Sequence, residues 1–121
     1  MPTSTDFSPK VCYDLTATIA VSGTTSGAVD LSGCTLVGLF IPATFDGTTL
    51  TITASPTLGG TYVPVQVDHT SASAYTITTT ASQYVPLSNL AIPAGLEFIK
   101  LVAGSTQTST STVITLAVRP T

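Results

Sequence analysis

The two short apolar runs between residues 36 and 54 limit the possible folds more than any other feature of the sequence. Residues 36–41 are apolar on both sides of an extended chain and end at Pro42, which predicts a central strand covered on both faces. Asp46-Gly47 predicts a turn. In residues 50–54 apolar and hydroxyl side chains alternate, which predicts a strand with one face in water. This pair of strands therefore predicts the core against which the rest of the chain packs.

Alternation with a period of two recurs along the chain, and no segment has the period of an amphipathic helix. It predicts one strand at residues 13–21, with Val21 on the dry face, and others at residues 75–78 and 113–118. Residues 96–103 predict a second interior strand. Pro64 places residues 61–67 at a sheet edge or a bulge, because proline cannot donate to a ladder. Residues 68–74 and 104–111 are predicted to be loops, the second without distinguishing features.

The predicted fold class is therefore all-β: a two-sheet antiparallel sandwich of about 8–9 short strands, jelly-roll-like. An immunoglobulin-like sandwich is the alternative, although the chain has no tryptophan and its cysteine spacing matches that fold poorly. The length of 121 residues suits one domain. We expect an N-terminal arm over residues 1–12, which carries two prolines and polar residues, and a single sandwich over residues 13–121.

Charge is unusually scarce. Charged residues make up 7% of the chain, against about 25% in a typical soluble domain, and serine and threonine fill the difference. The net charge of -3 comes from residues spread singly, and Lys10, Lys100 and Arg119 are the only strong bases, too few to neutralise nucleic-acid phosphates. The composition predicts a hydroxyl-covered surface that tolerates close neighbours, and no nucleic-acid partner.

The N-terminal residues contain no apolar core segment typical of a secretory signal, and no later stretch is long enough to span a bilayer. We therefore expect synthesis in the cytoplasm and no membrane partner. Cytoplasmic synthesis favours reduced thiols, so Cys12 and Cys34 are expected to be buried or half-buried free thiols. A bridge formed after release into an oxidising medium is the alternative.

Residue types that carry catalysis or bind metals are isolated in this sequence. His69 is the only histidine, and no nucleophile elbow accompanies it. The six acids stand apart, and most fall in predicted turns, where aspartate bonds the local backbone. Cys12, Cys34 and His69 lack the short spacings of a zinc site. We predict no enzyme activity, no cofactor and no metal.

Aromatic residues are the remaining candidates for a binding surface. Tyr62, Tyr75 and Tyr84 lie on predicted strands near loop ends, where exposed rings could stack on sugars. The alternative is that their rings are buried and only the hydroxyls reach water. Phe7, in the predicted arm, completes the candidate interaction surface: Phe7, Tyr62, Tyr75 and Tyr84.

Several segments resemble a group of small proteins encoded among the structural genes of tailed bacteriophages. The matching segments are residues 18–26, 29–31, 36–39, 98–102 and 114–116, and the similarity extends over residues 18–119. These are mostly strand and turn residues. The resemblance implies a β-sandwich component of the virion without a catalytic site, and it does not account for Cys12 and Cys34.

The resemblance and the low charge together predict a capsid decoration or cement protein that stabilises the head by bridging major capsid subunits. Many weak contacts would hold it on the shell. We expect the protein itself to be a homo-oligomer, joined through exposed strand edges or the N-terminal arm. The alternatives are an adhesion module that binds host-surface glycans and an accessory protein of the tail or neck.

Overall fold

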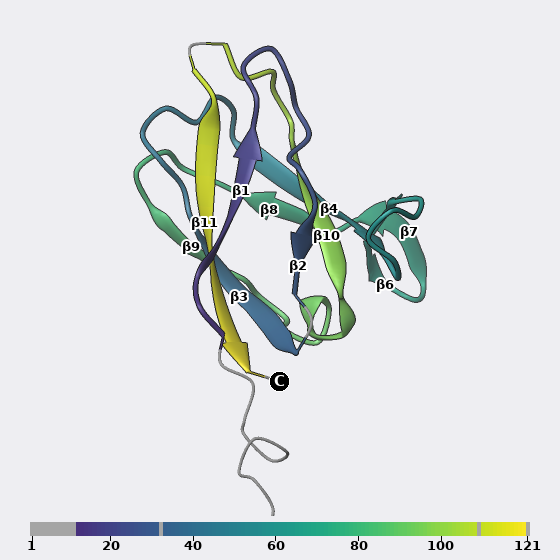
Figure 1. The fold of residues 1–121 in the computed structure, drawn as a ribbon. Coiled ribbons are helices and arrows are strands. Elements are labelled where there is room, and N and C mark those ends of the chain that lie inside the picture. The colour runs from purple at the N-terminus through teal and green to yellow at the C-terminus, as the bar shows by residue number, and fades with distance from the viewer. Residues whose placement is uncertain (1–11, 32, 109, 121) are drawn as a thin grey trace, which may run out of the picture.

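The strands of the protein form two facing antiparallel sheets, seen in a computed structural model that describes residues 12–31, 33–108 and 110–120 (Figure 1). One sheet has the order β1-β11-β3-β9. Its strands are β1 (Leu15–Ile19), β11 (Thr112–Pro120), β3 (Cys34–Phe40) and β9 (Tyr84–Pro86). We call it the four-stranded sheet.

The second sheet has the order β2-β10-β4-β5, and β8 pairs with the other half of the same edge of β4. Its strands are β2 (Val29–Asp30), β10 (Phe98–Ala103), β4 (Thr49–Ser55), β5 (Val63–Pro64) and β8 (Thr76–Thr78). The hairpin of β6 (Gln66–Asp68) and β7 (Ser71–Ala74) stands beside the sandwich in Figure 1. A short 3-10 turn, η2 (Pro93–Gly95), precedes β10.

The connectivity is that of a jelly roll. Leaving out the insertion β5 to β7, the chain moves to the other sheet at every connection except the one from β4 to β8. The first strand pairs with the last, and the resulting orders β1-β11-β3-β9 and β2-β10-β4-β8 describe two interlocked Greek keys. The predicted all-β, jelly-roll-like sandwich is confirmed. The described strands exceed the predicted 8–9, because the predicted strand at residues 61–67 is divided into β5 and β6 and part of the predicted 68–74 loop forms β7.

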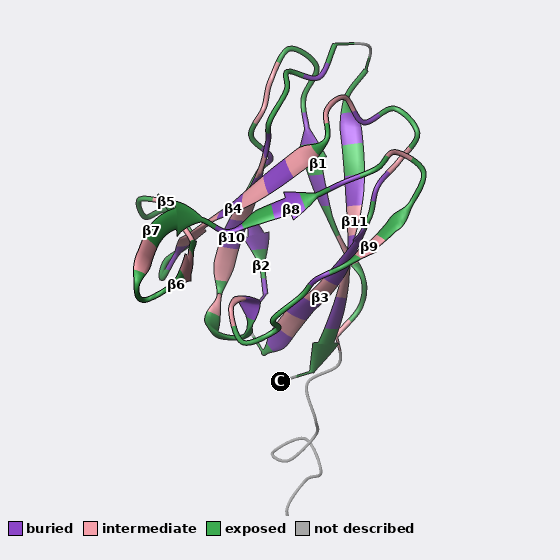
Figure 2. Ribbon diagram, turned by 180° about the vertical axis from the view of Figure 1, so that it is seen from behind, coloured by how far each residue is buried: buried purple, intermediate pink, exposed green. Residues whose placement is uncertain are grey.

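The core lies between the sheets and follows the predicted alternation. Along β11, Ile114, Leu116 and Val118 are buried while the residues between them face outward, and Figure 2 shows this alternation in colour. The second predicted interior strand, β10, lies between β2 and β4 as expected. Val21 was wrongly assigned to the core: it is 46% exposed, because β1 ends at Ile19 and the chain turns immediately afterwards.

The strand predicted to be central and covered on both faces is β3. Its central position is confirmed, but the described residues cover only one of its faces. It is interior to its sheet, with β11 and β9 on its two sides. A bulge in the pairing with β11 leaves Val37 without a counterpart, so Leu36 and Leu39, three residues apart, both point into the core. Phe40 then points outward and is 47% exposed. Among residues 12–31, 33–108 and 110–120, no further layer lies outside this sheet, so its outer face is partly exposed.

Gln107 gives the 104–111 loop, predicted to be featureless, a definite structure. Its side chain is fully buried. The amide nitrogen donates to the carbonyl oxygens of Asp46 and Ser105 at 2.9 and 3.1 Å. The amide oxygen accepts from the Asp46 backbone N–H at 3.0 Å and from the Thr112 hydroxyl at 2.8 Å. The backbone of Gln107 also exchanges hydrogen bonds with the turn at Ser22 and Gly23. One residue therefore joins three loops at one end of the sandwich.

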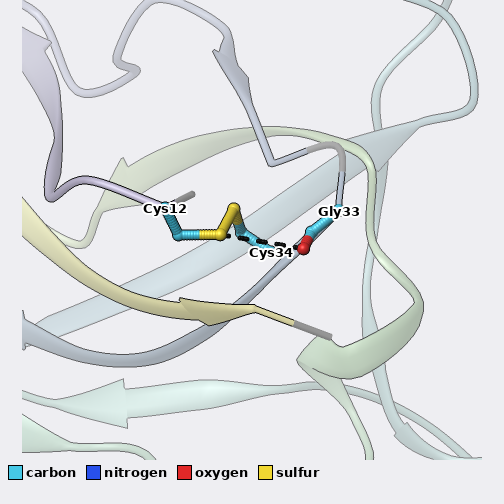
Figure 3. The surroundings of a disulfide bond; sticks show 3 residues. All are labelled: Cys12, Gly33 and Cys34. Carbon is cyan, nitrogen blue, oxygen red and sulfur yellow. Dashed lines mark hydrogen bonds between the residues drawn. A yellow bond between two sulfur atoms is a disulfide. The ribbon is translucent and has the colours of Figure 1, made fainter. Parts of the chain in front are cut away.

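The two cysteines form a disulfide, which corrects the expectation of free thiols (Figure 3). Cys34 begins β3 and also pairs with Pro120 near the end of β11. The Cys12 sulfur lies 3.7 Å from the carbonyl oxygen of Gly33, a contact without proton donation, because a disulfide sulfur carries no hydrogen. The fold brings the two residues to a Cα–Cα distance of 6.1 Å across a sequence separation of 22, a proximity that sequence spacing cannot reveal.

Two buried threonines provide a matched test of hydrogen bonding in the core. The Thr79 hydroxyl is buried and has no hydrogen-bond partner among the described residues, whereas the Thr112 hydroxyl donates to Gln107. We expect Thr79→Val to raise the free energy of unfolding by about 1 kcal/mol, because it removes an unsatisfied polar group at constant shape. Thr112→Val should lower it by about 1 kcal/mol. Urea unfolding of both variants measures the difference, and equal effects would contradict the assignment.

Candidate functional site

The outer face of the four-stranded sheet carries a groove of about 450 Å³. Its lining combines aromatic, small apolar and charged side chains: Asp14, Val37, Phe40, Tyr84, Ala117, Val118 and Arg119. We call this surface the aromatic face. It draws residues from β3, β9, β11 and the segment just before β1, so it spans the whole width of the sheet.

Three local features of the sequence build the aromatic centre of this face. The bulge at Val37 turns Phe40 outward, and the pairing of β3 with β9 sets Tyr84 directly opposite Phe40. Gly38 provides the space for the tyrosine ring, because a Cβ atom at Gly38 would overlap the ring and its hydroxyl. The ring centroids of Phe40 and Tyr84 are 4.7 Å apart at an interplanar angle of 52°, a favourable tilted arrangement.

The charged residues of the aromatic face are one acid and one base. Asp14 and Arg119 are both exposed, and neither forms an ion pair with another described residue. Ala117 pairs with Gly38 on β3, so the surface between the charges and the aromatic rings is made of small residues. The face offers apolar area together with two opposite charges that form no ion pair within the described part of the chain. Exposed apolar area with separate charges beside it suits contact with another molecule.

Of the predicted interaction residues that the structure describes, Tyr84 lies in this surface, and it is 44% exposed. Tyr75 is buried between the sheets, and its hydroxyl donates to the carbonyl oxygen of Ser88 at 2.9 Å. Burial raises the pKa of Tyr75, and the contact with Ser88 partly offsets this. The prediction that Tyr75 is an exposed stacking ring is therefore wrong, and the alternative, a buried ring, is confirmed for this residue.

Tyr62 lies over the other sheet, away from the aromatic face. Its hydroxyl donates to the carbonyl oxygen of Leu58 at 2.7 Å, and the Lys100 Nζ lies 4.5 Å from its ring centroid. Tyr62 is thus held by a local hydrogen bond and a cation–π contact. Phe7 lies outside the described residues. The three predicted residues that the structure describes therefore do not converge on one surface.

His69 lies in the exposed turn of the β6–β7 hairpin. Its neighbour Asp68 accepts hydrogen bonds from the hydroxyl and the backbone N–H of Thr70, at 2.6 and 2.7 Å, and these lower the pKa of the Asp68 carboxyl. Within residues 12–31, 33–108 and 110–120, no three His, Cys, Asp or Glu side chains gather in a way that could hold a metal ion. In this geometry the Asp68 carboxylate stabilises the turn of the hairpin.

Two further hollows carry less chemistry than the aromatic face. One, of about 250 Å³, lies between β8 and β9 and contains Tyr75 as its ionisable residue. The other, of about 360 Å³, lies beside Ala54 and Leu96 and contains Glu97. Neither brings two ionisable side chains together. None of the described helical segments is long and apolar enough to cross a membrane.

Local sequence patterns gave no indication that Phe40, Asp14 and Arg119 belong to the site. Phe40 is part of an uninterrupted apolar run, so it looked like core. The signal that could have identified it is Gly38 in the same run, because a glycine within a strand often marks a bulge or a close approach of another group. Asp14 and Arg119 are far apart in sequence and line the same groove only because the first and last strands pair.

Comparisons of the chain with known protein families, with curated proteins and with solved structures found no match. The fold and the site therefore define the class of protein: an all-β, jelly-roll-like sandwich with one aromatic sheet face that carries a single acid and a single base.

Proposed function

We propose that this protein is a structural component of a bacteriophage virion, namely a capsid decoration protein that stabilises the head by bridging major capsid subunits. The observation that carries the proposal is the aromatic face, where exposed apolar rings and few charges suit contact with other protein chains, whether capsid subunits or neighbouring copies on the shell. The resemblance of residues 18–119 to small structural proteins of tailed phages supports the same role.

The surface composition is consistent with crowding on a shell. With 7% charged residues, neighbouring copies repel one another little, and exposed threonine and serine hydroxyls can exchange water for neighbouring polar groups. A protein present in many copies is retained by the sum of weak contacts, so no single contact needs to be strong. The proposal accordingly requires a high copy number.

A glycan-binding adhesion module is the second candidate, and the pairing of Tyr84 with Phe40 favours it specifically. Exposed rings can stack on sugar faces, and Asp14 at the groove could accept hydrogen bonds from sugar hydroxyls. A glycan array tests this candidate. Selective binding that is lost in Tyr84→Ala would support it, and Tyr62→Ala is the control on the other sheet.

Purified particles test the decoration role directly. We expect hundreds of copies of this chain per virion, because a decoration protein follows the lattice of the shell; a few to tens of copies would place it in the tail or neck. Particles stripped of the protein should lose their genomes at lower temperature or after milder osmotic shock, and adding back purified protein should restore resistance. Unchanged resistance in stripped particles would contradict the cement role.

A further inference from the structure

We propose that the aromatic face is a self-association surface, through which two copies of this chain pair face to face about a twofold axis. The proposal goes beyond the role in the virion, because it concerns the isolated protein and holds or fails without a capsid. It also replaces the strand-edge contact expected from the sequence by a contact between sheet faces.

The apolar part of the surface suits the centre of a protein interface. Phe40 and Tyr84 are both nearly half exposed, although they are among the largest side chains of the sheet. Aromatic residues are enriched and charged residues depleted at interface centres. Beside the rings, Ala117 and Val37 leave a hollow in the same face. One surface therefore contains both a projection and a recess that could receive the projection of a second copy.

The two opposite charges favour a second copy of this chain as the partner over a strongly acidic or strongly basic protein. In a twofold interface, residue i of one copy contacts residue j of the other, and j contacts i. Asp14 of each copy can then meet Arg119 of the other, which produces two ion pairs from one acid and one base. The face has no net formal charge, so it does not favour a strongly acidic or basic partner. Asp14 and Arg119 also form no ion pair with described residues that would have to be broken first.

Pairing through strand edges is restricted. Pro86 lies in β9, the outer strand of the four-stranded sheet, and Pro64 lies in β5 at an edge of the other sheet. A proline has no backbone N–H to donate, so both edges are poor templates for an added strand. The edge strand β2 extends over only Val29–Asp30. The other edges are the five-residue β1, which contains no proline, and the three-residue β8. We place the contact on the sheet face because that face carries the exposed rings of Phe40 and Tyr84.

A charge-exchange experiment tests this geometry. Asp14→Arg places two bases on each face, and Arg119→Asp places two acids, so each variant alone should dimerise roughly tenfold or more weakly than the wild type. An equimolar mixture of the two variants should recover dimers, because each base of one copy then faces an acid of the other. The double variant, with both substitutions in one chain, should also dimerise. Sedimentation velocity over a range of concentrations measures all four samples.

The aromatic centre is tested in parallel. Tyr84→Ala should weaken dimerisation, and so should Gly38→Ala, which displaces the tyrosine ring while keeping it in the chain. Val63→Ala changes an apolar residue on the opposite sheet that is somewhat more exposed than Tyr84, so it is the control and should leave the dimer unchanged. Circular dichroism confirms that each variant is folded.

A wild-type protein that sediments as a 12.3 kDa monomer at every concentration would overturn the proposal. Single charge variants that remain dimers, or mixtures that do not recover them, would also overturn it. Shell binding by a monomeric protein would leave the decoration role standing while removing this interface. A dimer that does not bind shells would give the opposite result, so the two proposals can fail separately.

Discussion

Replacing Gln107 by alanine is expected to lower the free energy of unfolding by about 3 kcal/mol or more, because several buried polar groups lose their partners together. The Thr112 hydroxyl and the backbone N–H of Asp46 both donate to the Gln107 amide oxygen, and two carbonyl oxygens accept from its nitrogen. An alanine side chain leaves all four groups with a cavity in place of the amide. Water that enters the cavity can replace only part of this arrangement.

Gln107→Glu tests the contribution of the hydrogen bonds at nearly constant side-chain volume. A carboxylate keeps the acceptor but loses both donors, and it faces the carbonyl oxygens of Asp46 and Ser105. Because burial raises the pKa of such a carboxyl in the folded state, this variant should gain stability relative to wild type as the pH falls towards 4. The protonated acid again donates one hydrogen bond.

Urea unfolding at pH 7 measures the effect of each Gln107 variant. Gln83→Ala is the matched control: Gln83 is also a glutamine in a loop, but it is exposed, and its replacement should change the free energy of unfolding by less than about 0.5 kcal/mol. A Gln107→Ala variant as stable as the Gln83→Ala control would show that the three loops do not depend on this side chain.

Reducing the Cys12–Cys34 disulfide should lower the free energy of unfolding by about 3 kcal/mol. The bond restricts the unfolded chain by closing a loop between two cysteines separated by 22 residues, and reduction releases this restriction. For a domain of this size the melting temperature should fall by about 10 °C. The bond connects the segment before β1 to the start of β3, and β11 ends beside the start of β3. It therefore restrains β1 and β11, the first and last strands of the chain.

Differential scanning calorimetry with and without reductant measures this loss. The double variant Cys12→Ala/Cys34→Ala is the control: it should melt near the temperature of the reduced wild type, and reductant should not change it. Non-reducing mass spectrometry after alkylation establishes that the bond is present in the starting material. A wild-type melting temperature that does not respond to complete reduction would contradict the predicted stabilisation.

Local patterns predicted much of this fold. The residues assigned wrongly are those whose burial or partners depend on segments far away in the sequence. Ile114, Leu116 and Val118 alternate with outward residues and lie in the core as predicted. Phe40 sits in an apolar run that indicated burial on both faces, but whether a second layer covers a strand depends on the whole architecture. Gln107 resembles any polar loop residue, because its partners come from the Asp46 turn and Thr112.

By itself, the sequence determined the all-β class, the strands of the core and their inward faces, because alternation along a strand depends on residues two positions apart. It also indicated how few charges the surface carries. Only the tertiary structure decided that Cys12 meets Cys34, that Gln107 joins three loops, and that an aromatic groove with one acid and one base lies open on one sheet. Each of these depends on contacts between residues far apart in the chain, which exist once the strands have paired in register.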